Sequence, residues 1–311
     1  MKKWLTAALL CILSLVLLTG CTPTDTENAM DAQDGKLKVV VSFHAMKEFA
    51  EAVGKDHITV VTLIPDGTEP HDFQPTTKSL KALSHANVFI YNGLGMEPWA
   101  AKAIEVVEND AMISIDASQG VPTISLAEED DSMLHHHGHT GHGAQDPHCW
   151  LSLSCAQIEV QNIANAFAQA DPEHADAYQQ NAAAYKAQLQ QLLTAYQKKF
   201  AAVPNKQFVT GHAAFAYLCR DFDLSQNSVE SVFASGEPST QQMAKLVEYC
   251  KAHHVKTIFT EDMVSPKTSQ TLAHEVGASV QPIHTLESGE GDASYIDRMT
   301  ENLEEIYTSL Q

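Results

Sequence analysis

The chain has 311 residues, of which 44% are hydrophobic, and this composition is typical of a folded protein with room for two domains. It carries 39 acidic residues against 19 basic ones, for a formal net charge of -20. Such an acidic balance argues against nucleic acid and against anionic membrane surfaces as binding partners.

The first twenty residues have the pattern of a targeting segment. The basic start MKK precedes the apolar run WLTAALLCILSLVLL, which has the length of a signal-peptide core and is short for a membrane span. The following LTGC resembles the lipobox of bacterial lipoproteins, in which the signal is cleaved before the cysteine and the thiol receives a diacylglycerol. We therefore expect a signal peptide at 1–20, a lipidated Cys21 and a flexible tether at 21–35. A plain secretory signal or a short membrane anchor is the alternative.

Strand and helix patterns alternate along the next part of the chain. Apolar runs rich in β-branched residues predict strands at 37–43, 58–64, 87–93 and 112–115. Helical spacing of apolar residues predicts helices at 45–54, 77–86 and 98–108. This alternation predicts a mostly parallel sheet with helices on both faces, which forms an N-terminal α/β lobe at 36–171.

Residues 116–147 break this alternation. They contain acidic residues, glycines and the tract LHHHGHTGHG, and so predict a long mobile loop, with its histidine-rich part at 128–143. Glycines leave that tract too loose for a preorganised tight site. Its histidines are candidates for an accessory, low-affinity zinc site, the alternative being a solvated segment without a function: His135, His136, His137, His139 and His142.

Residues 172–203 predict one long helix. The segment has no glycine, and its apolar residues are three or four positions apart. At 1.5 Å per residue the helix would be about 45 Å long, too long for an element of one lobe. We therefore expect a rigid rod that joins two lobes.

The alternation resumes in a C-terminal α/β lobe at 204–311. Predicted strands lie at 207–211, 228–233, 255–261 and 278–283. Predicted helices lie at 213–222, 239–254, 265–277 and 293–310. Ser239 is a candidate N-cap, while Ser265 and Pro266 fit the N-cap and first helical positions of the next helix. The fold class is therefore α/β, with two similar lobes.

Four cysteines follow Cys21 in the chain, at positions 149, 155, 219 and 250. An even number in an exported protein permits two disulfides, and buried free thiols are an equal alternative. Their spacing does not match a zinc-ribbon pattern, so we do not expect them to bind metal.

Three histidines occur where predicted strands end: His71, His148 and His212. In open α/β sheets, ligands bind beyond the carboxyl ends of the strands. Imidazole nitrogen is a favoured Zn²⁺ ligand, and three or four such groups complete a site. Two of these histidines lie in the first lobe and one in the second, which predicts a metal site between the lobes.

A fourth ligand is expected from the second lobe, in the stretch PIHTLESGEGD after the last strand. Glu287 would complete a tetrahedral His₃Glu site suited to zinc, whereas His284 would give a His₄ site. Asp262 and Glu69 are more remote candidates. A carboxylate would also offset part of the charge of a dication.

Several motifs, in this order, resemble one known family: PHDFQPT, DPHCWLS, GHAAFAYL, SGEPS and SPKTSQTLAHEVGA. Together with the signal, the histidine-rich loop and the linking helix, they resemble the metal-binding lipoproteins of bacterial ABC importers for zinc and manganese (cluster A-I solute-binding proteins). The resemblance implies two α/β lobes bridged by a rigid helix, with the metal in the cleft between them. It places the family's ligands on His71, His148 and His212, with Glu287 as the carboxylate of the C-terminal loop.

Three imidazoles and one carboxylate suit Zn²⁺, while Mn²⁺ prefers more oxygen ligands. This ligand set favours zinc, and the resemblance implies a monomer, anchored to the outside of the cell membrane, that captures Zn²⁺ and delivers it to an ABC permease. Four protein ligands leave no open position for a substrate, so we do not expect an enzyme. The alternatives are a manganese-binding protein, an adhesin with this fold and, more remotely, a secreted zinc hydrolase. The last is disfavoured because the sequence contains neither HExxH nor GxSxG.

Overall fold

The computed structural model describes residues 35–126, 145–234, 238–261, 265–289 and 291–311. Several sequence-based predictions lie outside these residues: the signal peptide, Cys21 and its tether, the histidine-rich tract with His135, His136, His137, His139 and His142, and Asp262. In the part of the chain that the structure describes, no helix is both long and apolar enough to cross a membrane.

The N-terminal lobe contains a four-stranded parallel sheet in the order β2-β1-β3-β4. Its strands are β1 (Leu37–Val41), β2 (Ile58–Thr62), β3 (Val88–Tyr91) and β4 (Ile113–Asp116). Its connecting helices are α3 (His44–Gly54), α4 (Thr77–Ser84) and α5 (Ala100–Val107). The inner strand β1 is buried apart from the half-buried Lys38, as its run of three valines predicts.

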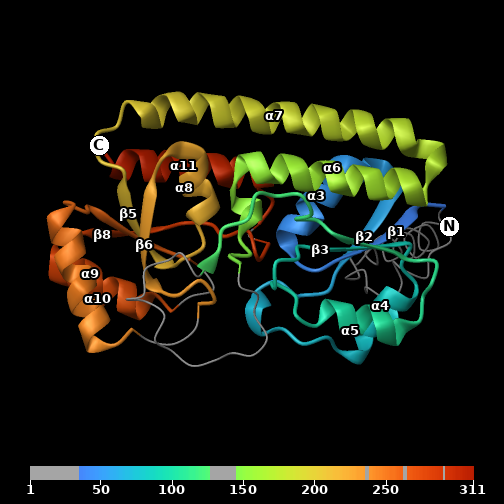
Figure 1. Cartoon of the computed structure of the whole chain (residues 1–311), viewed down its shortest axis with the longest axis horizontal. Helices are drawn as coiled ribbons and strands as arrows, with labels where there is room; N and C mark the ends of the chain where they lie inside the picture. The colour runs from blue at the N-terminus through green and yellow to red at the C-terminus, as the bar shows by residue number, and fades with distance from the viewer. Residues whose placement is uncertain (1–34, 127–144, 235–237, 262–264, 290) are drawn as a thin grey trace, which may run out of the picture.

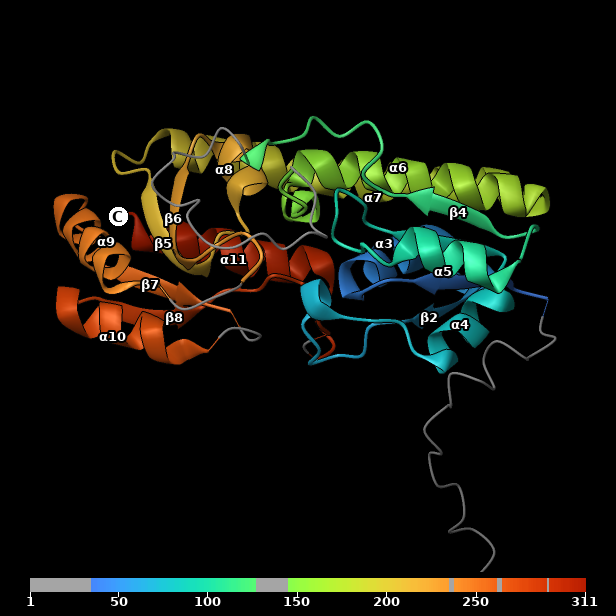
Figure 2. The ribbon, with the colours of Figure 1, turned by 60° about the horizontal axis from the view of Figure 1, so that its bottom comes forward.

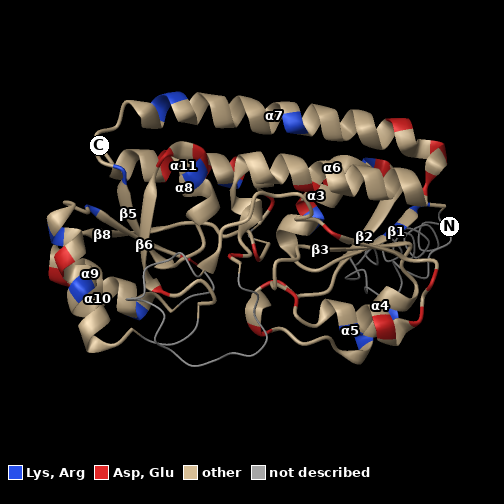
Figure 3. Cartoon of the chain, viewed as in Figure 1, with Lys and Arg blue, Asp and Glu red and all other residues tan. Residues whose placement is uncertain are grey.

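The C-terminal lobe repeats this plan, with a parallel sheet in the order β6-β5-β7-β8. Its strands are β5 (Gln207–His212), β6 (Ser225–Glu230), β7 (Thr257–Thr260) and β8 (Ser279–Pro282). Its helices are α8 (Ala216–Phe222), α9 (Thr240–Ala252), α10 (Pro266–Val276) and α11 (Tyr295–Ser309). The two-lobe α/β prediction is therefore confirmed. In Figure 3, acidic residues occur along the ribbon of both lobes.

The N-termini of two helices in this lobe were predicted correctly. Ser239 caps α9 and forms a capping box with Gln242. Ser265 and Pro266 occupy the N-cap and first positions of α10.

The sixth strand differs from its prediction at 228–233. It begins three residues earlier, because Gln207 of β5 pairs with Ser225 and the ladder continues through polar residues. β6 is an edge strand of the sheet, where polar residues are tolerated and the apolar pattern is weak. Val232 and Phe233, which extended the predicted strand, follow its end.

The helix α7 (Ala175–Ala201) runs along both lobes and confirms the predicted long rod (Figures 1 and 2). A short 3₁₀ turn at Pro172–His174 precedes it, so its 27 residues extend about 40 Å. Near its start, Tyr178 contacts Phe167 in the N-terminal half of the chain. Near its end, Phe200 contacts Phe222 of α8 and Tyr307 of α11. Buried aromatic contacts therefore fix the helix to each lobe.

A helix that the sequence analysis did not predict, α6 (Leu153–Ala170), packs along α7 (Figure 1). Ser152 caps it by accepting the backbone N–H of Cys155 at 3.1 Å. Its inner face mixes apolar residues with alanine and the buried Glu159, which weakens the apolar periodicity. The N-cap serine was the available signal for this helix.

The four cysteines of the folded part are buried free thiols. Of the two alternatives, the structure therefore has the free thiols. The Sγ of Cys149 donates a hydrogen bond to Glu159 Oε1 at 3.3 Å, and Arg220 donates one to the Sγ of Cys155 at 3.0 Å.

Candidate metal centre

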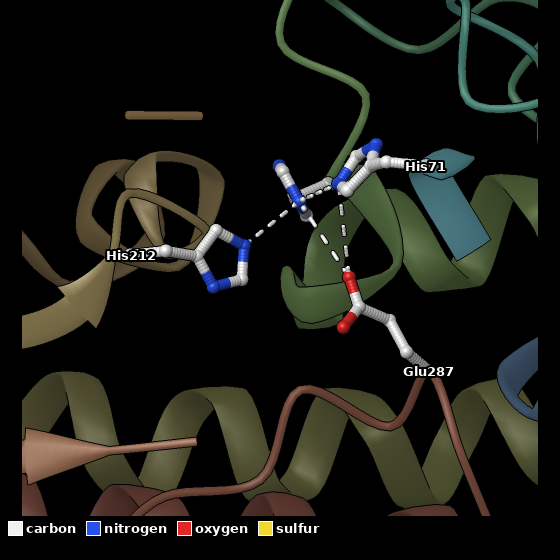
Figure 4. Close-up of side chains that lie close together, drawn as sticks. His71, His212 and Glu287 are labelled. Carbon is white, nitrogen blue, oxygen red and sulfur yellow. Dashed lines mark hydrogen bonds and ion pairs between the residues drawn. The ribbon is translucent and has the colours of Figure 1, made fainter. Parts of the chain in front are cut away.

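The structure brings together the four residues that the sequence predicts as metal ligands: His71, His148, His212 and Glu287. Each offers one ligand atom, all of these atoms lie within 4.8 Å of one another, and all four residues are buried. Figure 4 shows His71 and His212 approaching the cluster from opposite sides, with Glu287 reaching it from another chain segment. Among the described residues, no other group of histidine, cysteine and acidic side chains meets this criterion.

His71 lies in a short 3₁₀ turn, Pro70–Asp72, that follows β2. Glu69 caps this turn, because its carboxylate accepts the backbone N–H of His71 at 3.1 Å. The Nε2 of His71 lies 3.3 Å from the Nε2 of His148. Glu69 therefore supports His71 through the backbone and is not one of the clustered ligands.

His148 is held by Asp146, a fully buried residue that sequence reasoning missed. One oxygen of Asp146, Oδ1, accepts both the backbone N–H of His148 at 2.9 Å and its Nδ1–H at 2.8 Å. A carboxylate on Nδ1 leaves the lone pair on Nε2, which is the tautomer that binds a metal from that side. Tyr217 donates from its hydroxyl to the backbone oxygen of Asp146 at 2.7 Å and anchors the loop.

His212 is the last residue of β5 in the C-terminal lobe. Its Nε2 lies 3.3 Å from that of His148. Gln226 donates to its backbone oxygen at 2.9 Å, and Glu261 accepts its backbone N–H at 3.1 Å. Burial and the nearby His148 lower the pKa of His212 well below its ordinary value, so its imidazole is neutral and free to coordinate a metal.

The segment that carries Glu287 lies after the last strand, in the stretch that the sequence analysis named. It follows β8 of the C-terminal lobe, but its backbone is hydrogen-bonded to the N-terminal lobe. Trp150 Nε1 donates to Thr285 O at 2.7 Å, and the N–H of His44 donates to Glu287 O at 3.4 Å. The N–H of Gly289 donates to Asp66 at 2.7 Å. The loop that carries Glu287 is therefore hydrogen-bonded to the N-terminal lobe as well as to Asn302 of α11.

The electrostatic environment of Glu287 favours a cation. Burial raises the pKa of Glu287 well above its ordinary value, and the neighbouring Glu69 raises it further. Thr285 donates to Oε2 at 2.8 Å, whereas Oε1 has no hydrogen-bond partner among the described residues. That Oε1 lies 3.7 Å from His148 Nε2 and 4.0 Å from His71 Nε2. A buried carboxylate in this setting gains strongly from a bound metal ion.

The spacing of the ligand atoms fits a tetrahedral metal. Zinc bonds of about 2.0–2.1 Å in tetrahedral geometry place neighbouring ligand atoms about 3.4 Å apart. The two measured Nε2–Nε2 distances are both 3.3 Å, and the carboxylate oxygen is 3.7–4.0 Å from two of the nitrogens. The four side chains thus surround a space of the right size with only small adjustments.

The alternative ligands lie elsewhere. His284 Nε2 contacts Arg298 and Glu301, each at 3.3 Å, and the residue is outside the cluster. Its backbone N–H donates to Asn302 at 2.8 Å, which orients the loop toward α11. The arrangement therefore has a carboxylate, and not a fourth imidazole, beside the three histidines.

Comparisons with known proteins agree with this geometry. Residues 39–309 match the family model of ZnuA, the periplasmic component A of zinc-uptake complexes. A Treponema pallidum (strain Nichols) protein described as metal-binding is 44% identical over 273 residues, covering 88% of this chain and 86% of the relative. The high-affinity zinc uptake system protein ZnuA of Bacillus subtilis (strain 168) is 34% identical, and the match covers 99% of this chain and 98% of that protein.

Solved structures of similar proteins have the same architecture. The Zn(II)-bound structure of a variant of AdcAII from Streptococcus pneumoniae superposes with a TM-score of 0.80 at 29% identity. The match covers 89% of this chain and 99% of that one. Because the family model and these relatives span nearly the whole folded chain, the chain belongs to the ZnuA family of zinc-uptake solute-binding proteins.

Proposed function

We propose that this protein captures Zn²⁺ outside the cytoplasmic membrane and delivers it to an ABC permease, with zinc as the transported cargo. Its ligands are His71, His148, His212 and Glu287. The observation that carries the proposal is the buried cluster of four ligand atoms at tetrahedral spacing, with the Nε2 atoms 3.3 Å apart. The relative named as a high-affinity zinc uptake protein supports the same cargo.

Zinc fits this ligand set better than manganese. Three imidazole nitrogens and one carboxylate oxygen are typical of tetrahedral zinc, whereas Mn²⁺ favours more oxygen ligands. The described residues place a single carboxylate in the cluster. Copper and nickel bind such sites strongly as well, so selectivity depends on geometry and on metal availability.

The number of protein ligands favours a role in binding and release of zinc over a role in catalysis. A catalytic zinc keeps an open position for water or substrate, and four protein ligands close it. Release requires that the ligands separate. Because His71 and His148 lie in the N-terminal lobe and His212 lies in the C-terminal lobe, a small movement of the lobes would separate them and weaken the site.

The proposed location and partners come from the sequence. The LTGC motif supports a lipid anchor on Cys21, which would keep a monomer beside its permease. The tract with His135, His136, His137, His139 and His142 would be an accessory site that binds zinc weakly. Its low preorganisation suits fast exchange, while the buried cluster suits tight binding.

Competition with a chromophoric zinc chelator tests the proposal on the full chain. We expect one tight site, and we expect H148A to lose most of its affinity because this residue contacts two other ligands. H284A is the matched control, since His284 is a half-buried histidine of the same loop as Glu287 but lies outside the cluster. Tight binding that survives H148A, or is lost in H284A, would contradict the proposed ligand set.

A further inference from the structure

Glu261 is a buried carboxylate that lies beside His212 and outside the four clustered residues. It follows β7 in the C-terminal lobe, and only 3% of its surface is exposed. Its Oε1 accepts the backbone N–H of His212 at 3.1 Å and lies 3.9 Å from the Nδ1 atom of the same residue. Glu261 therefore faces the side of the imidazole that points away from His148.

The side chains of His212 and Glu261 lie close together but do not form a hydrogen bond with each other. Among the described residues, neither His212 Nδ1 nor Glu261 Oε2 has a hydrogen-bond partner, although both atoms are buried. Buried polar atoms almost always have a partner, and leaving one unmatched costs about 1–3 kcal/mol. A small shift of the imidazole toward the carboxylate would supply the missing bond.

The nitrogen that carries the ring proton of a histidine decides which nitrogen can bind zinc. Asp146 accepts the Nδ1–H of His148, so the Nε2 of His148 carries a lone pair. The Nε2 of His212 lies 3.3 Å from that atom, and so does the Nε2 of His71. Zinc on Nε2 of His212 requires the tautomer with the proton on Nδ1, beside Glu261.

We propose that Glu261 is a positioning residue for zinc binding: in the zinc-loaded protein it accepts the Nδ1–H of His212 and holds Nε2 toward the metal. This inference rests on the proposed zinc function. It assigns to the C-terminal lobe the same support that Asp146 gives to His148 in the N-terminal lobe.

Gly211 provides independent support, because it leaves room for this carboxylate. A Cβ atom at position 211 would collide with Oε2 of Glu261. The G211A substitution should therefore displace the carboxylate from His212 while it keeps both polar groups. It offers a second way to break the proposed contact without removing Glu261.

Zinc affinity and the ring proton of His212 together test the proposal in the full chain. Chelator competition gives the affinity of wild type, E261A, E261Q and G211A. Long-range ¹H–¹⁵N spectra of histidine-labelled protein loaded with zinc chloride report the Nδ1–H of His212, assigned by comparison with H212A. E97Q is the matched control, because Glu97 is another buried carboxylate that accepts two backbone N–H groups.

We expect E261A and G211A to lower zinc affinity about 10–100-fold, the usual effect of removing a partner of a ligating histidine. The zinc-loaded variants should also lose the slowly exchanging Nδ1–H signal of His212. E261Q keeps an acceptor oxygen and should retain the signal, with affinity within about threefold of wild type, and E97Q should change affinity by less than about twofold. Circular dichroism of each variant verifies that it is folded.

The proposal is overturned if folded E261A keeps the Nδ1–H signal and binds zinc within about twofold of wild type. It is also overturned if E97Q weakens zinc binding as much as E261A does. Failure of the wild-type protein to bind zinc through His212 would instead contradict the proposed function. The two failures are therefore distinguishable.

Discussion

Asp146 permits a sharp prediction, because its Oδ1 accepts two hydrogen bonds from His148, at 2.9 and 2.8 Å. The side chain is fully buried, so D146A leaves two buried donors without an acceptor. Each such donor costs about 1–3 kcal/mol, so the free energy of unfolding of the metal-free protein should fall by about 2–6 kcal/mol. Urea unfolding in the presence of a zinc chelator measures this loss.

The same substitution should weaken zinc binding. D146A removes the group that keeps the proton of His148 on Nδ1, and the loss of such a partner costs about 10–100-fold in metal affinity, or about 1.4–2.8 kcal/mol. Competition with a chelator measures it. D72A is the matched control, because Asp72 is an exposed carboxylate next to His71, another residue of the cluster. The reasoning is refuted if folded D146A binds zinc as tightly as D72A does.

Three further predictions concern the loop, the buried acids and the linking helix. Deletion of residues 133–143 should keep one tight zinc site and lose weaker ones in a calorimetric titration; loss of the tight site would contradict the assignment. Burial raises the pKa of Glu97 from 4.5 to about 7, so the folded state binds an extra proton between these values and stability falls as pH rises through them. The free-energy difference between E97Q and wild type in urea unfolding should therefore change by about 3 kcal/mol from pH 4.5 to 7, and a constant difference would refute this. F200A should lower the free energy of unfolding by about 3–5 kcal/mol in the same assay, because Phe200 is buried against Phe222 and Tyr307; a loss below about 1 kcal/mol would contradict its role in fixing the helix.

The candidate site was predictable because its geometry follows from topology. His71, His148 and His212 come after or at the end of strands or long loops, and the carboxyl ends of parallel strands gather at one edge of each sheet. The family motifs then select Glu287 among the polar residues of a variable loop. The contacts of that loop with the N-terminal lobe were not predictable, because they join residues far apart in the sequence, such as Asp66 and Gly289.

Asp146 and Glu261, the carboxylates beside His148 and His212, differ in how readily the sequence predicts them. Asp146 lies two residues before His148, and a short polar residue at that spacing can accept the following backbone N–H, so a local signal existed. Glu261 lies 49 residues from His212, and no local pattern links two residues at the ends of neighbouring strands. The bounds of β6 were predicted wrongly for a related reason, because backbone pairing with β5 extends the strand over polar residues.

The lobe boundaries at 36–171, 172–203 and 204–311 remain a prediction, as do lipidation of Cys21 and zinc binding by the histidine-rich tract. Limited proteolysis and mass spectrometry of the membrane-bound protein address the first two. Neither affects the buried cluster, whose four residues lie in described parts of both halves of the chain.

A crystal structure of the zinc-loaded protein, with an anomalous difference map at the zinc edge, tests the central claim most directly. The account predicts one strong peak at about 2.0–2.2 Å from the Nε2 atoms of His71, His148 and His212 and from a carboxylate oxygen of Glu287. A strong peak that is bound instead by His284, or by the histidines of the tract alone, would contradict it.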